Sequence, residues 1–403
     1  MLGRFGRAFY TKRPARSTAQ PLADSAFPYT RLAAFYFWYY GLLGLTHPFW
    51  ALFLAHRGFA PGEIGLMLAV QMGTRILSPN LWGWLADRSG KRLAVIRWGA
   101  FLGMASFAGI FLAEGFWGLL AVIAAYSFFW NAIMPQFEAL TLEHLGSRAQ
   151  RYGLVRLWGS VGFIVAVVGG GWWFELRLED FRHLGFAVLA LIWLSTLAVR
   201  DPDGGGRVAR GTAFAASLRA HPVWAFLLVS FLLQASHGVY YSFFSLHLEE
   251  AGYSRSQIGA LWALSVLSEI ALFLVMHRLL TSWGLRELFC GSLFLAAVRW
   301  WLIGAFPGHA ALLIAAQCLH AFSFGVCHAL SMEYLRRFFP PECRGRGQAL
   351  YSSVSFGAGG AAGSLLGGVL WEWGQALAFT VAGWLALLAA MLAWRYLDLK
   401  GMR

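Results

Sequence analysis

The chain has 403 residues, of which 59% are hydrophobic and only 13% are charged. A soluble domain carries about 25% charged residues, so this chain has too few to cover a water-exposed surface, and we expect lipid to cover most of it. The net charge of +13 falls in loops between apolar segments and not in one basic domain, which argues against a nucleic acid partner.

Residues 1–28 are basic and contain no apolar run, which predicts a cytoplasmic tail and argues against a cleaved signal peptide. Apolar segments of about 20 residues follow along the rest of the chain, each long enough to cross a bilayer as a helix. We predict twelve such helices, at residues 31–55, 62–86, 93–113, 116–140, 153–174, 183–199, 223–248, 257–280, 287–306, 310–335, 347–371 and 376–396.

The longest polar stretch inside the chain, residues 200–222, divides these segments into two equal sets. It contains an Asp-Pro-Asp sequence followed by three glycines, a composition typical of a flexible linker. We therefore predict an all-α membrane protein whose twelve transmembrane helices form two pseudo-symmetric six-helix bundles. The N-terminal bundle spans residues 29–199, and the C-terminal bundle spans residues 223–403, including a short cytoplasmic tail.

The distribution of basic residues predicts the orientation of the chain. Most of the 32 Lys and Arg residues lie in the tails and in loops on one side of the predicted topology, whereas the opposite loops contain only Arg57, Arg177, Arg182 and Arg255. Cytoplasmic loops of membrane proteins carry the excess of Lys and Arg. We therefore expect both termini and the linker in the cytoplasm, and a bacterial-type inner membrane as the location.

Two stretches of the first half recur in the second half. Residues 58–65 (GFAPGEIG) align with residues 252–259 (GYSRSQIG), and residues 138–143 (EALTLE) align with residues 328–333 (HALSME). Each pair has the same place and orientation within its own six predicted helices. Parallel repeats of this kind, with the substrate site between them near the mid-plane, are one organisation of secondary transporters.

The loop between the second and third predicted helices reads GWLADRSGKR over residues 83–92. It resembles the signature loop of the major facilitator superfamily at every signature position, although it can also be a basic turn that only fixes topology. The equivalent turn of the second half, residues 277–286, is degenerate. The resemblance implies a latch that holds the two halves together in the outward-open state, formed by Gly83, Asp87, Arg88, Gly90, Lys91 and Arg92.

Ionisable residues at membrane depth are costly and mark functional sites. Five occur within predicted helices: Arg75, Glu138, Arg156, Glu269 and Arg299. We interpret Arg75 as structural because it precedes a cation-rich loop. Glu138 and Arg156 lie in neighbouring helices joined by a short loop, so we expect them to meet near one depth, either as a binding pair or as a structural ion pair.

Residues 138–163 resemble the corresponding part of the lactose permease family, in which a Glu and an Arg with this spacing bind the sugar. Glu269, Arg299 and His320 also match ligand or coupling positions of that family. One departure concerns the proton carboxylate that the family has three residues after the histidine, where this chain has Ser323. The family's scheme of proton coupling therefore cannot be applied to this chain in full.

A second resemblance is to the 3-phenylpropionate permease family. The phrases PNLWGWLAD at residues 79–87 and QCLHA at residues 317–321 are typical of it. Together the two likenesses cover most of residues 31–395, and they imply a small organic substrate.

We predict a proton-coupled symporter that imports a small organic solute, with an aromatic carboxylate such as a phenylpropanoid favoured. Glu269 is expected to carry the proton and to pair with Arg299 on the adjacent helix, and Glu138 is the second candidate. A carboxyl group in an apolar span can gain and lose a proton as a cation or a substrate approaches. The predicted substrate-binding residues are Glu138, Arg156, Asn131, His237, Tyr241, Arg299, Gln317 and His320.

Other interpretations remain open at this stage. The chain can be a sugar or nucleoside symporter, with Glu138 and Arg156 bonding hydroxyl groups, an exporter of drugs or metabolites, or a membrane enzyme or sensor. Glu269 can be a neutral acid that holds a helix contact, Arg299 can bond a carbonyl, and His237 can be a satisfied core residue. No phosphate loop, nucleophile elbow or zinc-protease motif occurs, so we expect no enzyme activity, no cofactor and a functional monomer driven by a proton gradient.

Overall fold

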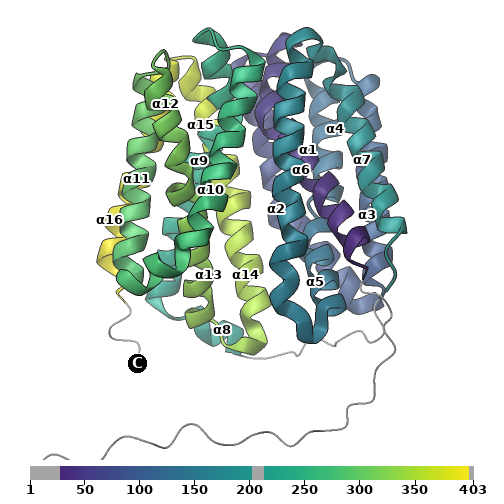
Figure 1. Ribbon diagram of the computed structural model, residues 1–403, viewed down its shortest axis with the longest axis vertical. Coiled ribbons are helices and arrows are strands. Elements are labelled where there is room, and N and C mark those ends of the chain that lie inside the picture. The colour runs from purple at the N-terminus through teal and green to yellow at the C-terminus, as the bar shows by residue number, and fades with distance from the viewer. Residues whose placement is uncertain (1–27, 202–212, 399–403) are drawn as a thin grey trace, which may run out of the picture.

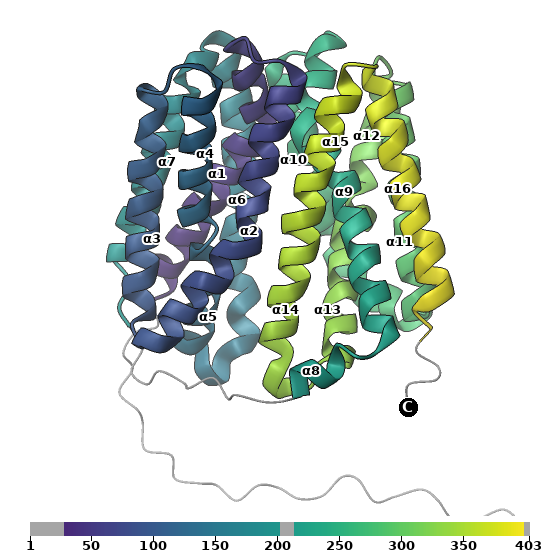
Figure 2. The ribbon, with the colours of Figure 1, turned by 180° about the vertical axis from the view of Figure 1, so that it is seen from behind.

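A computed structural model describes residues 28–201 and 213–398. Nearly all of these residues are helical, and neither range contains a strand. Figures 1 and 2 show from opposite sides that the helices of residues 29–199 lie together on one side and those of residues 213–398 on the other. Almost all of the predicted N-terminal tail, and half of the predicted linker, lie outside the described residues.

The first group of helices runs from α1 to α7. Its elements are α1 (Tyr29–His56), α2 (Pro61–Ser89), α3 (Arg92–Phe107), η1 (Ala108–Phe111), α4 (Gly115–Trp130), α5 (Ile133–Leu145), η2 (Gly146–Arg151), α6 (Tyr152–Leu176), η3 (Leu178–Asp180) and α7 (Phe181–Leu197).

The second group begins with a short helix in the linker region and runs to α16. Its elements are α8 (Ala213–Ser217), α9 (His221–Glu250), α10 (Arg255–Ser282), α11 (Leu285–Ala305), α12 (Ala310–Cys318), η4 (Ala321–Val326), α13 (Cys327–Phe338), η5 (Pro341–Cys343), α14 (Arg344–Ser352), η6 (Ser353–Gly359), α15 (Gly360–Trp371) and α16 (Gln375–Tyr396). Of these, η4 and η6 are π-helical.

Each predicted segment coincides with one helix or with consecutive helices, and the ends differ by a few residues. Among the described residues, nine helical segments are long and apolar enough to cross a membrane. One of them, Gly115–Leu176, contains 62 residues. A straight helix of that length would measure about 90 Å, roughly three times the hydrocarbon thickness of a bilayer. Gly146, with φ +49°, turns the chain between α5 and α6, so this segment crosses the membrane more than once and the protein is a multi-pass membrane protein.

The sequence repeat of residues 58–65 and 252–259 has the same local structure at both places. Gly58 and Gly252 adopt φ values of +85° and +90°, a region that favours glycine. Three residues later a helix begins in each half, and its third residue turns back to cap it. Glu63 Oε2 accepts from the Ala60 backbone N–H at 2.9 Å, and Gln257 Oε1 accepts from the Ser254 N–H at 2.9 Å.

Glycines at equivalent places allow equivalent helix contacts. A Cβ atom at Gly44 would lie 2.5 Å from the Phe163 carbonyl oxygen, where α1 meets α6. A Cβ at Gly238 would lie 2.5 Å from the Gly360 carbonyl oxygen, where α9 meets α15. Small residues let membrane helices approach closely, so both halves depend on the same kind of contact.

The two groups of helices pack closely near one end of the molecule, and α2 also contacts η6 and α14 further along. Gly65 on α2 packs against the Ser364 carbonyl on α15, and Gly259 on α10 packs against the Val167 carbonyl on α6. Beside the second contact, Arg255 Nη1 donates to the Phe174 carbonyl oxygen at 2.8 Å. The start of α1, the end of α16 and α8 all lie at the other end (Figure 1), where the groups stand apart.

Candidate functional site

A cavity of about 3090 Å³ lies between the two groups of helices. Its wall includes side chains from α1, α2, α5 and α6 on one side, and from α9, α10, η4 and α13 on the other. The cavity extends to Asp87, Asp201 and Arg346, at the end of the molecule where the groups stand apart. The contacts of α2 with α15 and of α6 with α10 close the opposite end.

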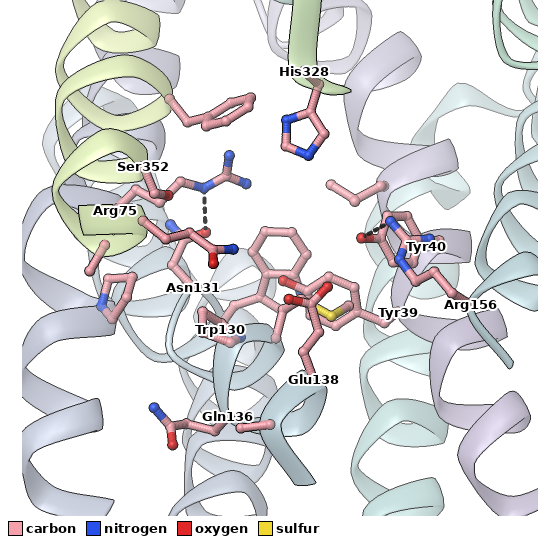
Figure 3. A pocket seen from close by; sticks show the side chains of 18 of the residues that line it. Tyr39, Tyr40, Arg75, Trp130, Asn131, Gln136, Glu138, Arg156, His328 and Ser352 are labelled. Atoms are coloured by element: carbon pink, nitrogen blue, oxygen red, sulfur yellow. Dashed lines mark hydrogen bonds between the residues drawn. The ribbon is translucent and has the colours of Figure 1, made fainter. Parts of the chain in front are cut away.

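Arg156 on α6 faces this cavity next to α1 (Figure 3). Its guanidinium lies 3.8 Å from the ring centroid of Tyr40, and its Nη2 donates a hydrogen bond to the Tyr40 hydroxyl. Among the described residues, Arg156 forms no ion pair. The tyrosine ring therefore holds a cation in the cavity that a ligand can neutralise.

Glu138 on α5 lines the same cavity but does not pair with Arg156, so the expected contact between them is absent. Its Oε1 accepts a hydrogen bond from the Tyr152 hydroxyl at 3.1 Å. Figure 3 shows the two side chains pointing into the cavity from different helices, with Arg156 drawn toward Tyr40. Both predicted residues thus reach one cavity, and space remains between them for a ligand.

Arg75, interpreted from the sequence as a structural residue, also has its side chain at the cavity. Arg75 on α2 lines the cavity, and its Nε donates to Asn131 Oδ1 at 3.3 Å (Figure 3). Asn131, predicted to bind substrate, lies in the break between α4 and α5 and is 5% exposed. It contributes to the cavity wall and holds Arg75 in place.

Glu269 on α10 faces the cavity opposite η4. Its Oε2 lies 3.9 Å from His320 Nε2, and the two side chains are 20% and 7% exposed. Gly325 lies directly behind the carboxyl group, since a Cβ atom there would lie 3.0 Å from Glu269 Cγ. π-Helical turns such as η4 occur frequently at functional sites, and this one positions His320 against the acid.

Arg299 does not face Glu269, and the expectation that the two pair is wrong in this structure. Arg299 on α11 is 0% exposed. It donates to Gln317 Oε1 at 2.9 Å and to Ser323 Oγ at 3.2 Å, and its guanidinium lies 4.2 Å from the Tyr240 ring centroid and 4.4 Å from that of Trp300. The reason is position: α11 packs against α12 and α16, behind the cavity wall.

His237 and Gln317 belong to the same buried cluster. Both are 0% exposed, and neither lines the cavity. His237 Nδ1 lies 2.9 Å from the Leu233 carbonyl oxygen, and its ring packs edge-on against Trp300. The predicted substrate contacts of Arg299, His237 and Gln317 are therefore corrected to roles behind the wall, whereas His320 and Tyr241 reach the cavity.

Aromatic rings form much of the cavity wall near its closed end. Tyr241 stacks on His47 with ring centroids 5.0 Å apart, and on Trp262 at 6.1 Å. On the other side, Tyr39 and Trp130 stack at 4.7 Å. His47 and Trp262 were not predicted, because neither α1 nor α10 has a hydrophobic periodicity that separates cavity-facing residues from the rest.

The predicted latch residues lie at the open end of the cavity. Asp87 Oδ1 is 3.7 Å from Arg92, which also forms an ion pair with Glu143 on α5. Gly90 ends α2 with φ +65°, and the guanidinium of Arg88 lies 5.2 Å from the Trp84 ring centroid. Gly83 packs against the Gln136 amide, and Lys91 is exposed at the start of α3. These contacts of the latch residues stay within the first group of helices.

The sequence profile of the MFS_1 like family matches residues 29–381. The chain belongs to this family. It is thus a transporter of the major facilitator superfamily, as its loop sequence, helical fold and central cavity indicate. The profile covers both groups of helices and the whole described cavity.

This transporter is similar to two curated proteins over most of its length. It is 31% identical to a probable 3-phenylpropionic acid transporter of Escherichia coli, with 85% of this chain and 91% of that protein covered. It is 29% identical to the maltose permease of Geobacillus stearothermophilus, with 95% and 96% covered. Among solved structures, the nucleoside transporter NupG has a TM-score of 0.78 at 18% identity, over 92% of this chain and 98% of that one, which supports the fold.

Proposed function

We propose that this transporter carries a small organic acid across the membrane together with a proton, and that an aromatic carboxylate such as a phenylpropanoid is the favoured substrate. The observation that carries the proposal is the guanidinium of Arg156, which faces the cavity without an ion-pair partner among the described residues. An unpaired charge at membrane depth is costly. Guanidinium groups bind carboxylates through two parallel hydrogen bonds, so a substrate carboxylate would supply the missing counter-charge.

The aromatic walls support a ring-bearing substrate. Tyr39 and Trp130 stack on one side of the cavity, and Tyr241 and Trp262 lie on the other. Aromatic pairs are worth about 0.5–1.5 kcal/mol beyond the burial of their surface. The 31% identity to a probable 3-phenylpropionic acid transporter agrees with this chemistry.

Glu269 is the proposed proton carrier, with Glu138 as the second candidate. Glu269 lies in an apolar stretch of α10 with the ring nitrogen of His320 at 3.9 Å and no Arg or Lys ion pair among the described residues. Burial favours the neutral form of a carboxyl group, and an approaching charge shifts that balance. Arg299 has a different part in this scheme, because it holds Gln317 and Ser323 and so supports η4 behind His320.

We further propose twelve membrane crossings in two six-helix bundles, residues 29–199 and residues 223–403 with the short C-terminal tail, joined by the linker of residues 200–222. Splitting Gly115–Leu176 at Gly146 and adding α1 and α2 to the remaining apolar segments gives this number. Arg88, Arg92 and Arg346 line the open end of the cavity and belong to the loops that hold the excess of Lys and Arg in the sequence, so the positive-inside rule favours a cytoplasmic location for that end. The protein then faces inward, as a monomer in a bacterial-type inner membrane without a cofactor, and the latch of residues 83–92 is released.

A sugar or nucleoside is the second candidate substrate. The 29% identity to a maltose permease over 95% of this chain favours it, and Glu138, Arg156 and Tyr152 can bond hydroxyl groups. Export remains the alternative direction on the same fold.

A thermal-shift screen of the purified protein against aromatic acids, sugars and nucleosides tests the substrate class, since a ligand that binds the folded state raises the midpoint of unfolding. We expect stabilisation by 3-phenylpropionate, and uptake of that acid into proteoliposomes with co-movement of protons. Stabilisation by maltose or a nucleoside alone would replace the proposed substrate. Export of the substrate against its own gradient would contradict the proposed direction, which is import.

The topology has its own test. A single cysteine in residues 200–222 should react with a membrane-impermeant reagent only after the cells are opened, because the linker is proposed to be cytoplasmic. Ready labelling of intact cells would refute this orientation.

A further inference from the structure

A second cation, Arg75, is held in the cavity with its charge available. Its Nε donates to Asn131 Oδ1 at 3.3 Å. Neither of its Nη atoms has an acceptor among the hydrogen bonds of the described residues, and no carboxylate pairs with it there. The nearest aromatic partner is Phe356 on η6, whose ring centroid lies 5.9 Å from the guanidinium carbon. The outer edge of the guanidinium therefore faces the cavity.

Asn131 is itself fixed, which makes this arrangement a built site. Its Nδ2 donates to the Gln71 carbonyl oxygen at 3.2 Å and to Thr74 Oγ1 at 2.9 Å. Thr74 in turn donates to Ser127 Oγ at 3.1 Å. With both donor bonds of the amide used, its oxygen can only face Arg75. The side chain is anchored through Nε and presents its two Nη groups as a fork, the geometry that binds carboxylates.

Arg75 and Arg156 lie on opposite sides of the cavity. Figure 3 shows Arg75 on one side with Asn131, Arg156 on the other with Tyr40, and Tyr39 and Trp130 between them. The two cations come from α2 and α6. A substrate with one acidic group satisfies only one of them, and its ring would lie over the aromatic side chains between.

We infer that Arg75, anchored by Asn131, is a second anion-binding subsite, and that the preferred substrate is an elongated organic acid with a second oxygen-bearing group at the end distant from its carboxylate. This inference rests on the proposed transport of organic acids with Arg156 at the first subsite. The second group is a carboxylate or a hydroxyl, and both have oxygen atoms that the Arg75 fork can bind.

A structural role for Arg75 makes a different prediction. Next to it, Asn80 Nδ2 donates to Ser353 Oγ at 3.2 Å, and Ser353 Oγ donates to the Ile76 carbonyl oxygen at 3.3 Å. These bonds connect α2 to η6, and Arg75 over Phe356 can simply extend them. A residue with that role alone would affect all ligands equally and would not distinguish substrates by their distal group.

The test compares three acids of the same skeleton on the purified full-length protein: 3-phenylpropionate, 3-(4-hydroxyphenyl)propionate and 3-(4-carboxyphenyl)propionate. We expect the wild type to bind the carboxyphenyl acid at least about tenfold more tightly than phenylpropionate, because the second carboxylate can form a charge-assisted hydrogen bond. The affinity for the hydroxyphenyl acid should lie between the two. This ranking needs no variant, so it stands even where a substitution impairs folding.

Substitutions then show which residue causes the difference in affinity among the three acids. Arg75→Met should bring the three dissociation constants to within about twofold of each other, Arg75→Lys should restore part of the preference, and Arg156→Met should weaken all three acids by a similar factor. Arg395→Met, at the exposed end of α16, is the matched control and should keep the wild-type ranking.

The outcomes separate the two proposals. The second subsite would be overturned if the wild type bound all three acids equally well. It would also be overturned if the Arg75→Met protein kept the preference for an acid with a distal group. Either result would leave the proposed function in place. Failure of all three acids to bind the wild type would overturn the proposed function, and the second subsite with it.

Discussion

The two walls of the cavity differ in how they use their cations. On the first group of helices, Arg75 and Arg156 reach the cavity, each fixed by one neutral partner. On the second group, the cation at membrane depth is Arg299, which is fully buried and surrounded by Gln317, Ser323 and two aromatic rings. The two halves therefore share a repeated backbone structure, but their arginines have different roles.

An arginine at membrane depth therefore has two distinct uses in this protein. Where an Nη group remains without a protein acceptor, the charge is available to a ligand. Where Gln317 and Ser323 accept from both Nη groups, the charge supports the wall that carries His320. Substitutions in the two walls test this division.

Replacement of Arg156 should have the largest effect on binding. Arg156→Met removes the donors proposed for the substrate carboxylate, and charged hydrogen bonds of this kind are worth roughly 1.5–3 kcal/mol. We expect the dissociation constant of 3-phenylpropionate to rise about 10- to 100-fold with little change in the melting temperature of the ligand-free protein. Calorimetry and thermal unfolding measure the two quantities, and unchanged affinity would place the carboxylate elsewhere.

Arg299→Met should show the reverse pattern. Gln317 Oε1 and Ser323 Oγ each lose a buried donor, at a cost of roughly 1–3 kcal/mol for an unsatisfied group. We expect a lower melting temperature, while the folded protein binds substrate within about threefold of the wild type. Loss of binding at an unchanged melting temperature would mean that Arg299 reaches the ligand and would break the comparison between the walls.

Gly325→Ala probes the wall that Arg299 supports. The new Cβ atom would lie 3.0 Å from Glu269 Cγ, tighter than an ordinary contact, and should displace the carboxyl from His320. We expect proton-driven accumulation to fall several-fold, since a small misplacement of a reacting group is costly, with substrate affinity nearly unchanged. Gly291→Ala, where a Cβ meets nothing within 4 Å, is the control. Equal effects of both variants would contradict a specific role for this contact.

Asp87→Asn tests whether charges at the cavity mouth act on conformation alone. Asp87 lies 3.7 Å from Arg92 and is half exposed, so its ion pair is worth only about 0.2–1 kcal/mol. We expect transport to slow by a few-fold, with binding unchanged, because the loop biases the conformational equilibrium without touching the ligand. Weaker binding with normal cycling of the bound substrate would assign Asp87 to the site instead.

Much of the fold could be predicted from the sequence, because long apolar runs, glycines and basic loops each have a direct physical meaning in a membrane protein. The turn glycines Gly58 and Gly252 and their capping residues are an example, since their alignment in the sequence is matched by their dihedral angles. The break at Asn131 and the π-helical η4 were not predicted, because hydropathy does not depend on the hydrogen-bond register within a helix.

The candidate site was harder to predict, for a reason that Arg75 and Arg299 illustrate. Both are cations within apolar helices, and the free-energy cost of a charge at membrane depth marked both as unusual residues. Which of them faces the cavity depends on how the helices pack, and α11 lies behind the wall whereas α2 forms part of it. Glu138 and Arg156, predicted as substrate-binding residues, both line the cavity, although the contact predicted between them is absent.

Glu269 is proposed to carry the proton that drives transport, and Glu269→Gln in proteoliposomes distinguishes this role from a structural one. The amide mimics the protonated acid, so we expect substrate exchange across the membrane to persist while accumulation driven by a pH gradient is abolished. Glu138→Gln, measured in the same way, shows whether the second candidate has this property. A Glu269→Gln protein that still concentrates substrate would contradict the account and move the proton site to Glu138, and a parallel fall of exchange and accumulation would reduce Glu269 to a structural residue.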